Sequence, residues 1–246
     1  MKPSTFPGGT SVSFLDVYED AAPDGLCGGS PHMHLASTEC YVVIAGRGTL
    51  HSIDATEGYR QVELQAGVVV WFTPGTIHRA VNYGGLQVVV LMGNAGLPEA
   101  GDAVMTFPAP VVADAERYRV AATLPDTDSP EEKATAARIR RDLAVTGFTS
   151  IHLALADGDA EPLQEFYASA ARLIGPRAHG WERIVRDGPL GQATETLAVV
   201  RALAAGNRDN LEASRVRQAP EPPAERGFGM CGRLRPYDVT TGVVEQ

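Results

Sequence analysis

The first part of the chain alternates short apolar segments with turns that contain glycine or asparagine. The apolar segments are rich in Val, Ile, Thr, Tyr and Phe, and they cover residues 11–17, 40–45, 49–53, 60–64, 68–73, 78–82 and 86–92. Short strands that follow one another without a helix between them are typical of an antiparallel sandwich or barrel. Several segments are apolar on both faces, which predicts that one face lines the barrel and the other lies under a second layer.

Helical patterns dominate after about residue 105. Ser129, Pro130 and the acidic residues that follow have the composition of a helix start, with a capping side chain and a proline in the first turn. We expect this helix to run to about Val145 and to stop at Gly147. Other expectations are an extended linker at 107–112, helices at 161–173 and 190–205 that end at Gly175 and Gly206, an ambiguous segment at 149–156, and a loop at 219–232.

These two patterns predict two parts. Residues 1–105 are expected to form the barrel, and residues 106–246 a mainly helical extension that packs on the barrel or on a second subunit. Ala193, Leu197, Val200 and Ala204 form an apolar stripe at helical spacing that suits such packing. The strand pattern occurs once, so a duplicated barrel is not expected. The helical part has no phosphate-binding loop, dinucleotide-binding turn or nucleophile elbow, which favours a structural role.

Composition and charge narrow the class of partner. The formal net charge is -9 and the pI is about 5.1, so no basic surplus is available to bind a nucleic acid backbone or an anionic membrane. The N-terminus lacks the apolar core of a signal peptide, and the apolar runs are too short to span a bilayer. Cys27, Cys40 and Cys231 form no CxxC pair, which predicts a reducing, cytoplasmic location.

Four side chains in the strand-rich part have the spacing of a metal site. His32 and His34 are separated by one residue, and on a strand they point the same way. Glu39 follows after a short excursion, and the turn at 73–77 ends at His78. Three imidazoles and a carboxylate suit one divalent ion such as Mn, Fe, Co or Ni and leave coordination positions open. A tetrahedral Zn ion, the other candidate, would be fully coordinated and would suit a structural site.

These residues resemble the two signature motifs of the cupin superfamily. The first motif contains His-x-His, four residues, Glu, six residues and Gly, matched by His32, His34, Glu39 and Gly46. The second contains Gly, five residues, Pro-x-Gly, two residues, His, three residues and Asn, matched by Gly67, Gly75, His78 and Asn82. The departures are Leu26 for a glycine, Thr73 for the proline and Val68 for an aspartate; none is a ligand position.

The resemblance covers about residues 11–95. It implies an all-β cupin barrel (an antiparallel jelly roll) with one metal of the three-His-one-Glu type, followed by an unassigned helical region. Cupin barrels commonly pair, so a homodimer is expected. The resemblance also implies a small-molecule substrate or ligand.

Other residues have weaker signals. Tyr41 and Asn82 share faces with Glu39 and His78, so each is a pocket candidate or a packing residue. Of the consecutive Trp71 and Phe72, one is expected in the core and the other at the mouth or an interface. The remaining expectations are surface or packing roles for His51, His152 and His179, an outward-pointing Cys40, and a solvated face for Arg138, Arg140 and Arg141.

Three functions fit such a site. The first is a sugar isomerase or epimerase, in which the metal acts as a Lewis acid and a nearby base moves a proton. The second is a dioxygenase. The third is a non-catalytic protein that binds or senses a small ligand through its metal. An open site beside an apolar wall favours an enzyme, although a fold alone does not decide the reaction.

Overall fold

Two sixteen-residue strands, β3 (Glu39–Asp54) and β6 (Ile77–Met92), pair along most of their length and form the centre of a barrel. The computed structural model describes residues 4–212 and 214–240. Within these residues nine strands form one antiparallel sheet, whose main path runs β4-β3-β6-β1-β9-β8. The strands are β1 (Ser11–Val17), β2 (His32–His34), β3 (Glu39–Asp54), β4 (Gly58–Gln65), β5 (Val69–Phe72), β6 (Ile77–Met92), β7 (Ala103–Met105), β8 (Gly227–Phe228) and β9 (Gly232–Pro236).

Each central strand joins two segments that the sequence pattern separates. Residues 40–45 and 49–53 both belong to β3, and the register with β6 shifts between them, which marks a bulge. Gly46 has a φ of 72° there, and a Cβ on it would lie 2.1 Å from the carbonyl oxygen of Gly85. The glycine therefore bends the strand without ending it.

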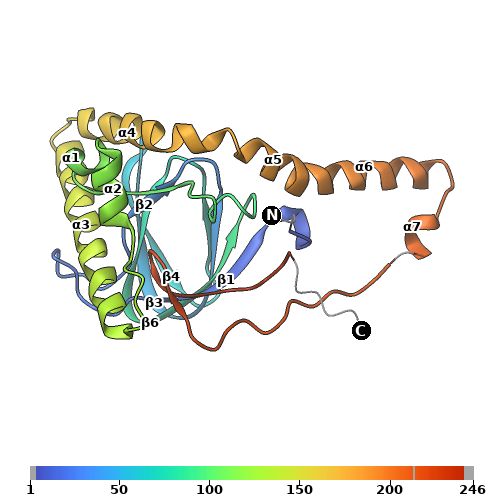
Figure 1. Ribbon diagram of the computed structural model, residues 1–246, viewed down its shortest axis with the longest axis horizontal. Coiled ribbons are helices and arrows are strands. Elements are labelled where there is room, and N and C mark those ends of the chain that lie inside the picture. The colour runs from blue at the N-terminus through green and yellow to red at the C-terminus, as the bar shows by residue number, and fades with distance from the viewer. Residues whose placement is uncertain (1–3, 213, 241–246) are drawn as a thin grey trace.

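A helical layer covers one side of the barrel (Figure 1). Its core includes Met33 and Ile77 from the sheet and Phe107, Phe148 and Phe166 from the helical region. The barrel interior is a separate apolar cluster. The helices are α1 (Ala109–Val112), α2 (Ala115–Ala122), α3 (Pro130–Ala156), α4 (Glu161–Ala178), α5 (Trp181–Val185), α6 (Gly191–Ala204) and α7 (Asp209–Glu212).

The expectation that a helix stops at Gly147 is wrong, because α3 continues to Ala156. A Cβ at Gly147 would lie 2.0 Å from the carbonyl oxygen of Thr106. The glycine lets the helix approach the backbone that leaves the barrel, so it serves close packing and does not act as a cap. Two other boundaries also differ: the expected linker at 107–112 contains α1, and α4 passes Gly175.

Arg140 and Arg141 are buried, which contradicts the solvated face expected for them. Arg141 donates hydrogen bonds to the carbonyl oxygens of Asp20 and Ala21, at 2.8 Å each. Arg140 donates to the carbonyl oxygen of Gly229 at 2.9 Å. Both guanidinium groups therefore connect α3 to irregular backbone whose carbonyl groups would otherwise lack partners.

The apolar stripe of α6 does not pack on the barrel. The helix projects beyond it (Figure 1), and the side chains of Leu197 and Val200 are 53% and 55% exposed. Packing on a second subunit, and the homodimer itself, stay predictions that light scattering at micromolar concentration would test. Among the described helices, none is long and apolar enough to cross a membrane.

The end of the described chain returns to the sheet, although a loop was expected over 219–232. Strands β8 and β9 form a hairpin, and β9 pairs with β1 from Ser13 opposite Pro236 to Val17 opposite Gly232. We call residues 227–236 the C-terminal hairpin. The part after residue 105 is thus mainly helical but supplies one wall of the barrel, and the division into two domains stays a prediction.

Candidate metal centre

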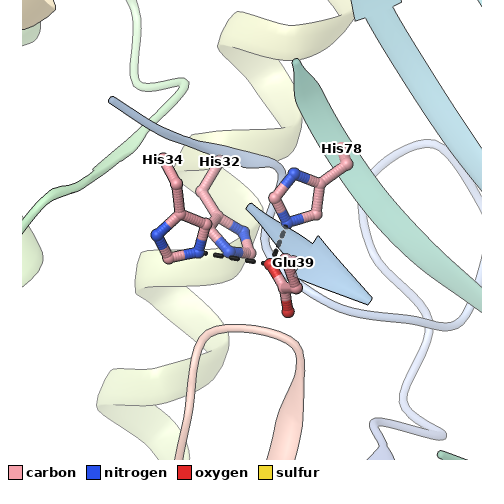
Figure 2. Close-up of side chains that lie close together, drawn as sticks. All are labelled: His32, His34, Glu39 and His78. Atoms are coloured by element: carbon pink, nitrogen blue, oxygen red, sulfur yellow. Dashed lines mark ion pairs between the residues drawn. The ribbon is translucent and has the colours of Figure 1, made fainter. Parts of the chain in front are cut away.

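Three strands bring the four candidate ligands together. His32 and His34 lie on β2, Glu39 begins β3, and His78 lies on β6 directly opposite His32. All four side chains are buried, and one donor atom from each lies within 4.8 Å of the others. Figure 2 shows the three imidazole rings arranged around the carboxyl group of Glu39. The spacing in the sequence predicts this convergence; the role of the residues as ligands stays a prediction.

The three imidazoles are oriented by their Nδ1 atoms. Nδ1 of His32 lies 2.9 Å from the carbonyl oxygen of Ser30, and Nδ1 of His78 lies 3.1 Å from that of Thr76. A carbonyl oxygen only accepts, so each Nδ1 carries the proton and each Nε2 keeps its lone pair. Nδ1 of His34 likewise donates to a carboxylate oxygen, Oδ1 of Asp102, at 2.8 Å. All three Nε2 atoms are therefore left available to a metal.

The centre of the cluster holds polar atoms without hydrogen bonds. Oε2 of Glu39 lies 3.3 Å from Nε2 of His34 and 3.1 Å from Nε2 of His78. Neither Oε2 of Glu39 nor Nε2 of His78 makes a hydrogen bond of good geometry, although both are fully buried. Unpaired buried polar atoms are costly, and a divalent cation would satisfy both. The residues present therefore fit a metal ion.

The charges of the cluster favour a cation. Burial alone would raise the pKa of Glu39, but the neighbouring His78 and His34 outweigh it and hold this pKa well below its usual range. Burial lowers the pKa of His34, but its hydrogen bond to Asp102 and its close contact with the charged Glu39 outweigh that effect and raise the pKa to about 9. A metal would take the place of the proton that His34 otherwise holds.

Asp102 is a residue that the sequence analysis missed. It is fully buried, and besides His34 it accepts a hydrogen bond from the backbone N–H of Ser37 at 2.9 Å. It immediately precedes β7, which pairs with β2 so that Ala103 lies opposite His34. Asp102 could not be found from the sequence, because its position depends on the pairing of β2 with β7, which no motif indicates.

Cys231 is a second missed residue. Its Sγ lies 3.9 Å from Nδ1 of His32 and 3.6 Å from the hydroxyl oxygen of Tyr41. Burial, and then the charge of Glu39, raise the pKa of this thiol to about 12, so the thiol is neutral. The residue was overlooked because its segment was expected to be a loop outside the barrel.

Residues 19–93 match the Cupin domain family. This segment is therefore similar in sequence to a cupin domain. The match covers less than half of the chain, and it includes the four candidate ligands but neither Asp102 nor Cys231. The matched segment therefore receives a polar partner and a thiol from segments outside the family match.

Part of the chain is also similar to parts of solved structures. They include the capsular polysaccharide assembling protein CapF from Staphylococcus aureus, with 20% identity over 34% of this chain and 22% of that chain and a TM-score of 0.25. WlaRA, a TDP-fucose-3,4-ketoisomerase from Campylobacter jejuni, has 9% identity over 38% and 64%, with a TM-score of 0.32. Recombinant oxalate oxidase in complex with glycolate has 20% identity over 36% and 51%, with a TM-score of 0.25. The chain thus spans less than two thirds of each of these proteins, and no curated protein matches it.

The two pocket candidates, Tyr41 and Asn82, have different surroundings. Tyr41 is buried beside the cluster, with its ring 6.5 Å from that of His78. Asn82 instead bonds backbone: its amide nitrogen donates to the carbonyl oxygen of Val17, and its oxygen accepts from the N–H groups of Gly84 and Leu86. These bonds agree with the packing alternative for Asn82, and a pocket role for either residue stays a prediction.

Several weaker expectations agree with the structure. Phe72 is 8% exposed with its ring 4.1 Å from that of His78, whereas Trp71 is 68% exposed, so one faces the core and the other the solvent. His51 is a buried packing residue that bonds Thr49 and Tyr59. His179 is exposed, and His152 is half-buried with its ring 3.9 Å from that of Tyr59.

A cavity of about 150 Å³ adjoins the cluster, and His32, His34 and Glu39 form part of its wall. Another part of the wall comes from the C-terminal hairpin, including Cys231 and Leu234. In Figure 2 the pale red loop of this hairpin passes beside the four side chains. A larger hollow of about 780 Å³, lined in part by Trp71 and Phe72, touches none of the four. The small cavity is therefore the space in which a ligand would meet the cluster.

Proposed function

We propose that this chain is a metal-dependent enzyme that acts on a small oxygen-rich molecule, with dioxygenase chemistry as its reaction. The observation that carries the proposal is that one side of the cluster is open to the cavity. A structural metal site is closed by its protein ligands, whereas a catalytic site keeps a position open. Here His32, His34 and Glu39 all border a space of small-molecule size.

Each residue near the cluster has a distinct part in this proposal. His32, His34, Glu39 and His78 would hold a divalent ion, which when bound polarises oxygen atoms of the substrate and supplies redox chemistry. Asp102 fixes the ring of His34 through Nδ1 and keeps Nε2 directed at the cluster. The hydrophobic residues that line the cavity exclude water around the substrate.

The groups available for proton transfer favour the dioxygenase over the isomerase. Outside the cluster, the titratable side chains among the described residues that line the cavity are Glu99, Cys231 and Tyr237. The thiol of Cys231 is neutral because its pKa is raised to about 12, and it is a poor base in that state. Glu99 is exposed at the rim, where it accepts a hydrogen bond from the N–H of Gly96. A dioxygenase adds both atoms of O₂ to its substrate and requires no external reductant.

The isomerase is the second candidate, and Glu99 is the residue that favours it. Its carboxyl group lies at the cavity rim and could take a proton from a substrate carbon and return it to a neighbour. Indifference of turnover to O₂, together with loss of turnover in Glu99→Gln, would support this reading.

The proposal is tested by metal analysis and oxygen uptake. Elemental analysis of protein purified without a chelating tag should find one Fe, Mn, Ni or Co per chain, and His32→Ala and His78→Ala should lose it. His179→Ala, at an exposed position, is the control and should keep the metal. Turnover of small diketones or hydroxy acids should consume O₂. No metal in the parent, or turnover without O₂ uptake, contradicts the dioxygenase; stabilisation by ligands without turnover would indicate a binding protein.

A further inference from the structure

The C-terminal hairpin is a fixed part of the cavity wall. The carbonyl oxygen of Gly229 accepts hydrogen bonds from the hydroxyl of Tyr18 at 3.0 Å and from Arg140 at 2.9 Å. The carbonyl oxygen of the next residue, Met230, accepts from the N–H of Ser30 at 2.8 Å. Together with the pairing of β9 and β1, these bonds hold the hairpin against the cluster. The size of the cavity is therefore set by the fold and not by a loose loop.

The hairpin limits the space above the cluster to about 150 Å³. A cavity of this size holds a molecule of about six non-hydrogen atoms. Leu234 packs against the barrel-interior cluster and Met230 against the helical core, and both side chains border the cavity. These two side chains occupy the space that a longer substrate would need.

The cavity has no cationic side chain among the described residues that line it, apart from its histidines. The hairpin does carry arginines, but strand alternation directs them outwards. The guanidinium of Arg233 lies over the ring of Phe228 at 3.9 Å, and that of Arg235 lies 5.7 Å from the ring centre of Phe14. The rim instead carries the carboxyl group of Glu99, which repels a second negative charge on a ligand.

We propose that the C-terminal hairpin is the specificity element of this site and that it selects a compact substrate of about six non-hydrogen atoms, uncharged or with one negative charge. This inference rests on the proposed function and names its substrate class. Phosphorylated and nucleotide-linked molecules are excluded, since they exceed the cavity and carry charges that none of the described side chains in its wall balances. Met230 and Leu234 set the length limit, and Glu99 sets the charge limit.

Three related hydroxy acids test both limits. Lactate, mandelate and tartronate share one hydroxy acid group and differ in a methyl, a phenyl and a second carboxylate. The protein is loaded with Co²⁺, whose visible absorption reports both ion uptake and any ligand that enters its coordination sphere. In the parent, lactate should change the spectrum, and mandelate and tartronate should bind at least about tenfold more weakly.

The variants separate size from charge. Leu234→Ala and Met230→Ala, both at half-buried positions, should each tighten mandelate binding about tenfold and leave tartronate binding weak. Glu99→Gln should tighten tartronate binding and leave mandelate weak. Trp71→Ala, outside the cavity, is the control and should change neither.

Two kinds of failure are distinguishable. Absence of Co²⁺ uptake by the parent contradicts the metal site and with it the proposed function. Normal Co²⁺ uptake with equal affinity for lactate and mandelate, or with no response to lactate, overturns the inference on substrate class and leaves the metal site standing. Thermal unfolding of each variant shows that a loss of binding is not a loss of fold.

Discussion

Asp102 accepts a hydrogen bond from Nδ1 of His34 at 2.8 Å, from a position outside the segment that matches the cupin family. The bond fixes which nitrogen of His34 carries a proton and which faces the cluster. The carboxyl group is itself held by the backbone N–H of Ser37. Orientation of the candidate site thus depends on a residue that the family match does not include.

Asp102→Asn should lower metal affinity about ten- to a hundredfold, because a neutral amide orients and polarises His34 less well than a carboxylate. Affinity is measured by competition with a chelator of known strength. Ser37→Ala is the matched control: its hydroxyl is buried without a partner, and its backbone N–H remains to bond Asp102. Equal affinity in Asp102→Asn and the parent would show that the bond does not support the site.

Gly147→Ala should destabilise the protein by about 1–3 kcal/mol, because the new Cβ would collide with the carbonyl oxygen of Thr106 and push α3 away from the barrel. Thr146→Ala, one residue away on the exposed side of the same helix, should be neutral or slightly stabilising, since alanine is the better helix former. Urea unfolding compares the two. A stabilised Gly147→Ala variant would contradict the close approach inferred here.

His51 should make stability fall with acid. Burial, and then the charge of Arg79, lower its pKa to about 4; Asp24 opposes this effect and His152 adds to it, while the hydroxyl of Tyr59 bonds Nδ1. The unfolded chain protonates His51 near pH 6.5 and the folded chain does so only near pH 4. The unfolded state therefore binds more protons between these values, so the stabilisation is complete above pH 6.5 and is lost as pH falls towards 4.

The measurement is the free energy of unfolding of the parent and of His51→Gln between pH 4 and pH 7. The parent should lose up to about 3 kcal/mol more than the variant over this range, because each pKa unit corresponds to about 1.4 kcal/mol. The difference between the two proteins isolates His51 from the other histidines. Parallel curves would show that His51 titrates normally in the folded state.

Arg140→Met should expose the thiol of Cys231, because it removes the hydrogen bond to Gly229 that holds the C-terminal hairpin. In the parent this buried, neutral thiol should react with a thiol reagent far more slowly than the half-buried Cys27 and Cys40. The variant should increase the rate about tenfold or more, as expected when a buried charge-assisted hydrogen bond is lost. Arg138→Met, on the exposed side of α3, should leave the rate unchanged, and a fast reaction in the parent would contradict the closed hairpin.

The convergence of the four candidate residues was predictable because their spacing obeys local rules. His32 and His34 share a face because side chains alternate along a strand. The turn before His78 leads directly into β6, another strand of the same barrel. These relations depend on a few neighbouring residues, so the sequence is enough to find them. The strand pattern before residue 105 is readable for the same reason.

The remaining features depend on contacts between distant segments. Asp102 and Cys231 reach the cluster only through the pairing of β7 with β2 and of β9 with β1, and no local pattern indicates either pairing. Gly147 looks like a helix end in sequence because its function is to leave space for Thr106, which lies in another segment. Arg140 looks solvated because its acceptors are backbone carbonyl groups of the loops it touches.

The pairing of β1 with β9 has a consequence for how the protein is made. During synthesis, β1 emerges from the ribosome long before its partner β9, because the helical region lies between them in the sequence. Such a non-local contact slows folding and leaves an edge of the sheet open to other strands in the meantime. A nascent or truncated chain that ends before β9 therefore has an unpaired edge at β1. We expect such fragments to aggregate, because the pocket wall combines strands from both ends of the described chain.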